Sequence, residues 1–481
     1  MASYRSGTSP RWRAAAVQPW RDKLSQLRDA VRGPVFTADD ADYASEVAVF
    51  NTAVRHRPAV VVGAAGAADV SEAVRFAVEH GLYVAVLNTG HGPTVPADAD
   101  TLMITTSRMS GLFIDVENRC ARVEAGVRFG QLVDAAAKYG LAPLPGSSPG
   151  VGVVGYTLGG GASATMGRKY GWAADHVTDI DVVTADAQLR CVSAVSEPDL
   201  FGALLGGKSN FGVVVAMKFA LFPVTSLYAG ALFYSGEHSR RVLKAFRELT
   251  ASAPDELTTG LALLNLPPLP GLPPFMQGRL TVSVRVSYVG DPSIGARLID
   301  PLRRAAPVLA DGVASIPYAQ FATISNDPTD PAPAVEHFAL LRELGQDTVD
   351  AIVDVAGPGS GSAINIVDIR HLQGSFSKPA AFPNAVGARD AAYAMFALTV
   401  VPPGDEVAGY RNSGRELVAA LDPWLHDMAN PSFVGPADTP EDRTRRAYAP
   451  DVYEELRTVK AKYDPRNTFR LNHNIPPRVA V

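Results

Sequence analysis

Gly90-His91-Gly92 ends a short apolar segment, and about 55 residues later the chain reads Gly146-Ser-Ser-Pro-Gly-Val-Gly-Val-Val-Gly-Tyr-Thr-Leu-Gly-Gly-Gly161. Because glycine has no Cβ, such turns let backbone N–H groups approach the oxygens of a phosphate closely. Two turns of this kind can hold one diphosphate between them. The histidine in the first turn is also a nucleophile able to bond to a cofactor. Together the two segments predict a site for a large phosphorylated cofactor.

Length and composition indicate a globular protein with two lobes. The 481 residues exceed one ordinary core, and 47% hydrophobic with 19% charged residues excludes a disordered chain. A net charge of −5 argues against nucleic acid, and no apolar run reaches the ~18 residues of a membrane span. Met1–Pro34 lacks the apolar stretch of a secretory signal, and two cysteines, Cys120 and Cys191, fit a reducing compartment. We expect a cytoplasmic monomer or homodimer that uses neither nucleic acid nor a membrane.

Metal binding is not expected, because the nine histidines show no paired metal-ligand spacing. Apolar patterns in the first half instead predict strands mixed with helices. Val70, Ala73, Val74 and Ala77 recur at helical spacing between two apolar runs, which indicates a β-α-β unit over 59–87. The ranges that we predict are helices at 22–33, 69–80 and 129–139, strands at 59–63, 83–87 and 213–221, and hairpins at 113–124 and 177–192.

The second half predicts an antiparallel sheet with helices on one face. Residues 281–288 alternate valine with polar residues, which is typical of a half-solvated strand. Further strands are expected at 362–372 and 391–401, and helices at 238–250, 293–305, 333–345, 405–421 and 453–463.

The glycine segment allows three interpretations. Gly150, Gly152 and Gly155 spell the dinucleotide-binding motif GxGxxG, and Asp175 lies about 20 residues further on. That motif requires a strand before it, whereas residues 141–149 contain three prolines, which a central strand does not tolerate. The glycines can also serve turns alone. The third interpretation, an anion-binding nest paired with the first turn, accounts for both segments.

Eight blocks of the chain, in order, resemble the berberine bridge enzyme-like flavoprotein oxidases of the vanillyl-alcohol oxidase/PCMH-type superfamily. They are Pro58–Val62, Asn88–Gly92, Gly146–Pro149, Val151–Gly161, Gly167–Gly171, Val183–Asp186, Asn210–Val214 and Lys462–Ile475. The resemblance implies an α+β fold: a two-lobed PCMH-type FAD-binding domain and a substrate domain made of an antiparallel sheet with helices on one face. The implied bounds are 27–225 for the FAD-binding domain, 226–428 for the substrate domain and 429–481 for a segment that returns to the FAD-binding domain.

The resemblance further implies FAD as the cofactor, bonded once, from His91 to the flavin 8α-methyl carbon. Many relatives add a second bond from a cysteine, but the matching residue here is Ser148, a poor nucleophile without an activating base. The alternative for His91 is that it caps a turn. The implied cofactor-binding residues are Asn88, Thr89, Gly90, His91, Gly92, Gly146, Ser147, Ser148, Val151, Gly152, Val153, Gly155, Tyr156, Gly160, Gly212, Val213, Val214, Asn472 and Asn474.

Two of these residues have implied roles beyond binding. Tyr156 stands where many relatives have histidine, so its phenol can donate to the flavin N1–C2 carbonyl region as negative charge builds there; it can also simply pack under the ring. Val151 lies near the position that screens the flavin from dioxygen in plant relatives, where valine usually accompanies oxidase activity.

Candidate catalytic residues besides Tyr156 lie in the predicted substrate domain. Strand alternation places Asp368 and Arg370 on one face and His371 on the other. The first two can be a base and an anion clamp facing the flavin, or an ion pair facing solvent. The stretch Asn430–Phe433 matches a Tyr-Val-Asn-Tyr-like motif of relatives but has lost its tyrosines.

The predicted function is an FAD-dependent oxidase. It would take a hydride from a small organic, secondary-metabolite-like substrate to flavin N5, with dioxygen as the acceptor. Two alternatives stay open. One is an NAD-dependent dehydrogenase, indicated by GxGxxG. The other is a flavin-holding or small-molecule-binding protein with decayed catalysis, indicated by the lost tyrosines.

Overall fold

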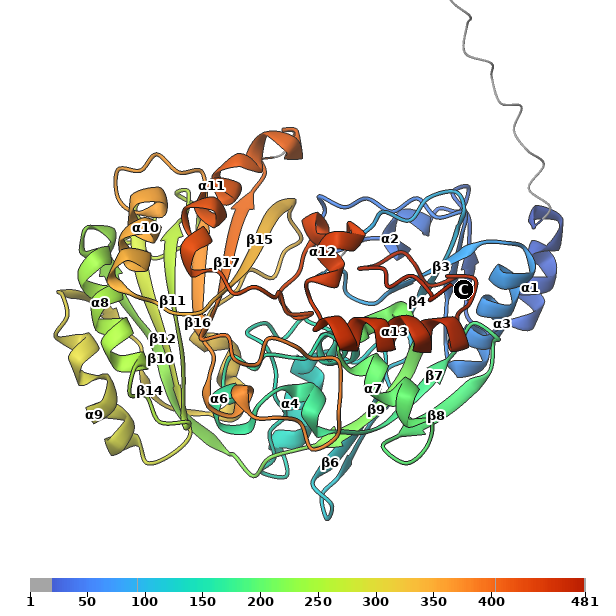
Figure 1. Cartoon of the computed structure of the whole chain (residues 1–481), viewed down its shortest axis with the longest axis horizontal. Coiled ribbons are helices and arrows are strands. Elements are labelled where there is room, and N and C mark those ends of the chain that lie inside the picture. The colour runs from blue at the N-terminus through green and yellow to red at the C-terminus, as the bar shows by residue number, and fades with distance from the viewer. Residues whose placement is uncertain (1–19, 93, 403, 480–481) are drawn as a thin grey trace, which may run out of the picture.

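Two lobes lie side by side in the computed structural model, which describes residues 20–92, 94–402 and 404–479 (Figure 1). Three sheets build them: a four-stranded and a five-stranded sheet from the first half of the chain, and an eight-stranded sheet from the second. No helix within these residues is both long and apolar enough to cross a membrane.

The four-stranded sheet positions the histidine turn. Its order is β1 (Val35–Phe36), β2 (Val60–Gly63), β4 (Thr101–Thr105) and β3 (Tyr83–Leu87). Strands β2, β4 and β3 are parallel, and α3 (Ala67–Glu79) connects β2 to β3, which confirms the predicted β-α-β unit. Since β3 ends at Leu87, the chain enters Asn88–Gly92 directly from a strand held in the sheet. The short helices α1 (Leu24–Ala30) and α2 (Tyr43–Glu46) complete this region.

The five-stranded sheet supports the glycine segment. It is antiparallel, in the order β5 (Leu112–Asp115), β6 (Cys120–Glu124), β9 (Val213–Ala220), β7 (Val177–Val183) and β8 (Leu189–Ser193). Four helices accompany it: α4 (Phe129–Ala137), α5 (Val153–Leu158), α6 (Gly167–Tyr170) and α7 (Pro198–Gly207). Helix α5 begins inside the glycine segment and buries Val153, Val154 and Leu158 in the core, which fixes that segment against the sheet.

The eight-stranded sheet is antiparallel and carries helices on one face, as predicted (Figure 1). Its other face is turned toward the first lobe. The order is β13 (Val308–Asp311), β10 (Ser226–Ser235), β12 (Leu280–Tyr288), β11 (Leu257–Asn265), β16 (Ile366–His371), β17 (Tyr393–Val400) and β15 (Ala334–Leu341), with β14 (Ala314–Pro317) also paired to β10. The covering helices are α8 (Ser239–Thr250), α9 (Pro292–Arg303), α10 (Gln346–Ala356) and α11 (Asn412–Ala420).

Two local predictions in this sheet are wrong. The helix expected at 333–345 is strand β15. Other elements cover both faces of this strand, so its sequence lacks the alternation of apolar and polar residues that marks a strand. Ala339 and Leu341 pack toward the helices, and Phe338 and Leu340 pack toward the other lobe. The strand expected to be half-solvated, β12, is buried on its polar face as well, where Ser283 and other hydroxyl residues face the first lobe. Strands β10 and β11 and helix α10 were not predicted.

A buried ion pair anchors the end of the chain to the first lobe. Helix α13 (Pro450–Tyr463), which follows the short helix α12 (Glu441–Arg445), packs against α7. Lys460 Nζ donates to Asp464 Oδ2 at 2.7 Å, to the carbonyl of Asn210 at 2.6 Å and to that of Phe469 at 3.1 Å. Both charged side chains are fully buried. The same Asp464 accepts two backbone N–H groups of the following turn, so this pair shapes the tail over 464–475.

We therefore predict that Lys460→Met strongly destabilises the protein, because it leaves the Asp464 carboxylate buried without its cation. Breaking a buried pair in this way costs about 3–5 kcal/mol of unfolding free energy. The matched control is Lys462→Met two residues later, whose exposed pair with Asp199 contributes within about 1 kcal/mol. Urea unfolding of both variants measures the difference; equal stabilities would contradict the role of the pair.

Candidate cofactor and substrate site

The two glycine segments meet at the edge of the first lobe. A Cβ added at Gly152 would lie only 2.5 Å from Asn88 Nδ2, and one added at Gly150 would lie 3.7 Å from His91 Nε2. The second segment is held in place by the backbone, since Val151 accepts from Phe129 N and Val153 donates to the Val127 carbonyl, both at 3.0 Å. Side chains are excluded where the segments approach, which leaves backbone N–H groups accessible for an anionic ligand.

His91 is presented as a neutral nucleophile. Gly90 turns the chain with a φ of +64°, and a Cβ there would collide with Val49. The His91 ring stacks on Phe50 with centroids 4.1 Å apart, and its Nδ1 lies 2.9 Å from Thr89 Oγ1. Burial first, and then the positive charge of Arg128, lower the pKa of His91 to about 4. The imidazole is therefore uncharged at neutral pH and retains a lone pair for bond formation.

Unsatisfied oxygens mark the place of a missing polar ligand. Buried polar atoms almost always have hydrogen-bond partners. Within the part of the chain that the structure describes, however, Asn88 Oδ1, Tyr156 Oη, Asn472 Oδ1 and Asn474 Oδ1 have none. These atoms come from the histidine turn, helix α5 and the C-terminal tail, and all four residues were predicted to bind the cofactor. A ligand with several hydrogen-bonding groups fits this set.

Lys208 is a further residue of this region that the sequence analysis missed. It adopts a φ of +56°, unusual for a residue with a side chain, and its Cε lies 3.3 Å from the position of a Cβ on Gly159. Burial lowers its pKa to about 8. The neighbouring Asn210 holds the tail, because its amide group bonds the backbone of His473 and Ile475. A lysine beside glycines in Gly206-Gly-Lys-Ser-Asn210 was the available signal.

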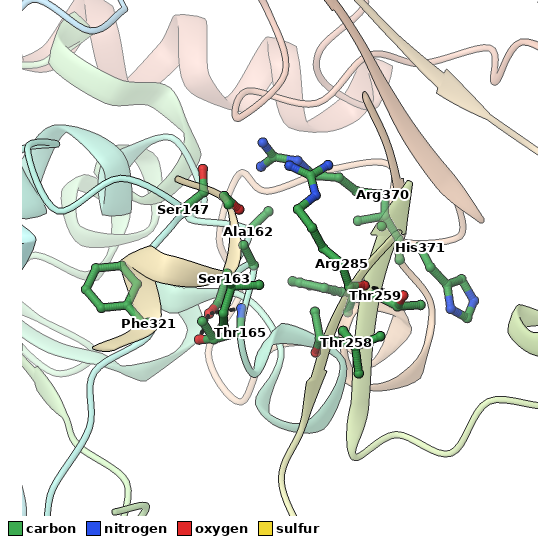
Figure 2. Close-up of a pocket in the computed structure, with 17 residues that line it drawn as sticks. Ser147, Ala162, Ser163, Thr165, Thr258, Thr259, Arg285, Phe321, Arg370 and His371 are labelled. Atoms are coloured by element: carbon green, nitrogen blue, oxygen red, sulfur yellow. Dashed lines mark hydrogen bonds between the residues drawn. The ribbon is translucent and has the colours of Figure 1, made fainter. Parts of the chain in front are cut away.

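A pocket separates this cradle from the eight-stranded sheet. One wall comes from the first lobe, with Ser147, Ser163 and Thr165, and the other from β11, with Thr258 and Thr259. Apolar residues, among them Phe321 of a short 3₁₀ helix, Tyr318–Ile324, complete the lining. Figure 2 shows the guanidinium groups of Arg285 and Arg370 next to each other on the side of Ser147 and Ala162, with His371 directed away.

Asp368 lies behind these two arginines. Arg285 donates to its Oδ1, and Arg370 Nε donates to its Oδ2 at 3.0 Å. Its side chain is 3% exposed, against 16% for Arg285 and 29% for Arg370. Burial alone would raise the pKa of Asp368, but the two guanidinium groups bring it below its ordinary value. Asp368 and Arg370 thus share a strand face as predicted, and that face borders the pocket rather than solvent.

Comparison with known proteins finds two matching family domains and similar relatives. The "FAD binding domain" family matches residues 58–193, and the "Berberine and berberine like" family matches residues 426–476. The (R)-6-hydroxynicotine oxidase of Paenarthrobacter nicotinovorans is 27% identical over 93% of this chain and 97% of its own length. Over nearly its whole length the chain is similar to the berberine bridge enzyme-like FAD-linked oxidases, and it carries both of their family domains.

Solved structures show the same fold. The 6-hydroxy-D-nicotine oxidase of Arthrobacter nicotinovorans superposes with a TM-score of 0.80 at 25% identity, covering 93% of this chain and 98% of that one. Berberine bridge enzyme from Eschscholzia californica superposes at 0.82 with 18% identity, covering 95% and 99%. FAD is accordingly the cofactor of this berberine bridge enzyme-like protein, and the NAD-dependent alternative is not supported.

The structure explains why the GxGxxG motif does not indicate a dinucleotide-binding fold in this chain. The residues before Gly150 form no strand of a sheet, so the motif lacks the strand that a dinucleotide fold requires. Asp175, the expected ribose ligand, instead accepts from Arg389 at 2.7 and 2.9 Å and from Asn384 Nδ2 at 2.9 Å. It fastens the loop around residue 384 to the first lobe.

The remaining predicted residues fall into two groups. Tyr156 lies in α5 with its ring edge-on to Phe129, centroids 5.0 Å apart, and burial raises the pKa of its phenol far above the usual range, so it stays neutral. By contrast, Val213 and Val214 are core residues of β9. Gly212 precedes them, and a Cβ there would lie 2.5 Å from the Val183 carbonyl oxygen; these three support the fold of the cradle from beneath.

The stretch 430–433, which we matched from the sequence to a tyrosine-containing motif of relatives, packs on the glycine segment. Ser432 Oγ donates to the Gly159 carbonyl at 2.8 Å and accepts from Gly161 N at 3.0 Å. Asn430 Nδ2 donates to the Gly387 carbonyl at 2.7 Å. These bonds use the polar groups of the stretch to hold backbone in place.

We predict that Gly152→Ala weakens flavin binding. The added methyl group must displace Asn88, and overpacking of this kind costs about 1–3 kcal/mol. Bound flavin per chain, measured by absorbance, should fall at least twofold. Gly409→Ala is the matched control, because nothing lies within 4 Å of a Cβ at that exposed position. A Gly152→Ala protein with the parental flavin content would contradict the close approach of the two segments.

Proposed function

We propose that this protein oxidises a small organic, secondary-metabolite-like molecule in the pocket between the lobes, with dioxygen as the electron acceptor and with FAD bonded once, through His91. The observation that carries the proposal is the neutral, buried imidazole of His91 beside a cradle whose oxygens lack partners. When bound, FAD would supply the capacity to accept two electrons from a substrate C–H bond and to return them, with two protons, to dioxygen. The chain supplies binding, orientation and electrostatics.

The residues around His91 support the proposal of a single attachment. Ser148 Oγ lies 3.6 Å from the Cβ position of Gly150, next to the His91 ring, and accepts from Gly150 N at 3.3 Å. Among the described residues no basic side chain hydrogen-bonds to this hydroxyl, so serine is a poor nucleophile here. Cys120 and Cys191 lie in β6 and β8, away from the cradle, and provide no second thiolate.

Tyr156 and the tail asparagines orient the cofactor. A neutral phenol donates a hydrogen bond, and Tyr156 Oη has no partner among the described residues. We assign it to the flavin N1–C2 carbonyl region, where negative charge grows during substrate oxidation. Asn472 is already oriented, because its Nδ2 donates to Ser209 Oγ and to the Phe469 carbonyl, both at 3.2 Å, which leaves its oxygen for the ligand.

His91→Ala should leave FAD bound without a covalent bond. Acid precipitation of the variant then releases yellow flavin into the supernatant, whereas the parent keeps its flavin in the pellet. The matched control is His80→Ala, another partly buried histidine beside a phenylalanine, Phe76, whose flavin should stay in the pellet. Flavin released equally from parent and variant would rule out His91 as the attachment point.

Val151→Leu should slow reoxidation of the reduced protein. Val151 is partly buried, packs against the core beside the cradle and has its carbonyl held by Phe129 N. We propose that a longer side chain at this position narrows the path for dioxygen. We expect at least a tenfold slower reaction after photoreduction and rapid mixing with dioxygen, and an unchanged rate for Val195→Leu, which lies on the surface. Identical traces for parent and Val151→Leu would remove Val151 from the dioxygen path.

A further inference from the structure

We propose that the pocket recognises a carboxylate, or an equivalent oxyanion, on the substrate through the paired guanidinium groups of Arg285 and Arg370. This inference rests on the proposed function, since it assumes that the substrate enters the pocket between the lobes. It goes further by naming the chemical class of the substrate and by assigning Arg285, on which the sequence analysis was silent.

The sheet is built to bring the two arginines together. Arg285 of β12 and Arg370 of β16 both pair with Gly260 of the strand between them, β11. Side chains two strands apart start about 9–10 Å from each other, and they converge only if the intervening residue leaves room. A Cβ on Gly260 would lie 3.6 Å from an Arg285 terminal nitrogen and 3.0 Å from the Ile369 carbonyl oxygen. Glycine at this position therefore forms the floor on which the two guanidinium groups meet.

The local charge is unbalanced in favour of an anion. Two arginines face one carboxylate, Asp368, so the cluster carries one net positive charge. Both oxygens of Asp368 are already used, one by each arginine. A guanidinium group has five N–H donors, and most of those on Arg370 and Arg285 are left for a ligand. Asp368 is buried and is not among the residues that line the pocket, whereas both arginines line it, so their free donors are available to a ligand there (Figure 2).

The rest of the lining is compatible with an organic anion. It consists of serine and threonine hydroxyls and of apolar side chains such as Phe321, Ile324 and Phe376. No aspartate or glutamate is among the described residues that line it. The negative charge of Asp327, on the loop after Ile324, acts to raise the pKa of Arg370 and of His91, but Asp327 is not among the residues that line the pocket. A carboxylate held by two planar guanidinium groups gains charge-assisted, paired hydrogen bonds, while the apolar residues contact the rest of the molecule.

The positive charge of the two arginines can also stabilise a different anion, the reduced flavin. The two sources are separable. A substrate carboxylate predicts that the arginines control ligand choice in the oxidised protein, whereas a flavin anion predicts that they control the midpoint potential of the bound flavin without affecting ligand choice.

The test uses the flavin-loaded protein and three pairs of probes of matched shape: acetate and acetamide, benzoate and benzamide, and 2-naphthoate and 2-naphthamide. Binding is followed by the change in the visible flavin spectrum at constant ionic strength. We expect the parent to bind at least one acid tenfold more tightly than its amide. Arg370→Gln and Arg285→Gln should reduce that preference to less than twofold, and Arg370→Lys should keep only part of it, because lysine lacks the two-donor fork.

The control is Arg304→Gln, an arginine on the surface whose loss should leave the preference intact. No acid preference in any pair for the parent, or a preference that survives both glutamine variants, overturns the proposal, as does a change confined to the midpoint potential. Flavin content and reoxidation by dioxygen, measured on the same samples, separate this result from a failure of the proposed function. A protein that contains no flavin contradicts the proposed function. A flavin-loaded protein that binds acids and amides equally well contradicts only the proposal that the pocket recognises a carboxylate.

Discussion

The site depends on the close approach of two backbone segments that no side chain can separate. At Gly152 a methyl group would collide with Asn88, and at Gly90 it would collide with Val49. Because both positions are glycine, the His91 ring comes to lie beside Gly150 and Ser148. The four-stranded sheet delivers the first segment from β3, and helix α5 fixes the second. The remaining cradle residues are arranged around this contact.

The two lobes then divide the chemistry. We propose that the first lobe and the tail hold the cofactor. The tail owes its position to a buried charge pair, Lys460 with Asp464, rather than to apolar packing alone. The eight-stranded sheet presents its helix-free face to the pocket, where it carries two cations and one carboxylate at Arg285, Asp368 and Arg370. In our proposal this charged cluster, surrounded by apolar residues, selects a ligand by its charge, while the first lobe supplies the flavin.

Much of the first lobe could be predicted because its signals are local. The β-α-β unit before His91 follows from helical spacing over 69–80, and the sequence motifs indicated the residues of both glycine-rich turns. Prediction of the second lobe requires knowing which other elements cover each strand, and the spacing of residues in the sequence does not show this. Strand β15 therefore looked like a helix, and the polar face of β12 looked solvated. Arg285 lay on that face, so its partner across the sheet could not be recognised before the register at Gly260 was known.

The central claim is that the neutral imidazole of His91, set between the two segments, carries the only bond to FAD. The most direct measurement is peptide mass mapping of the denatured, protease-digested protein. We predict one FAD on the peptide that contains His91 and none on the peptide that contains Ser148. Unmodified His91 peptide in a protein that is yellow when purified, or a second flavin bond elsewhere, would contradict it.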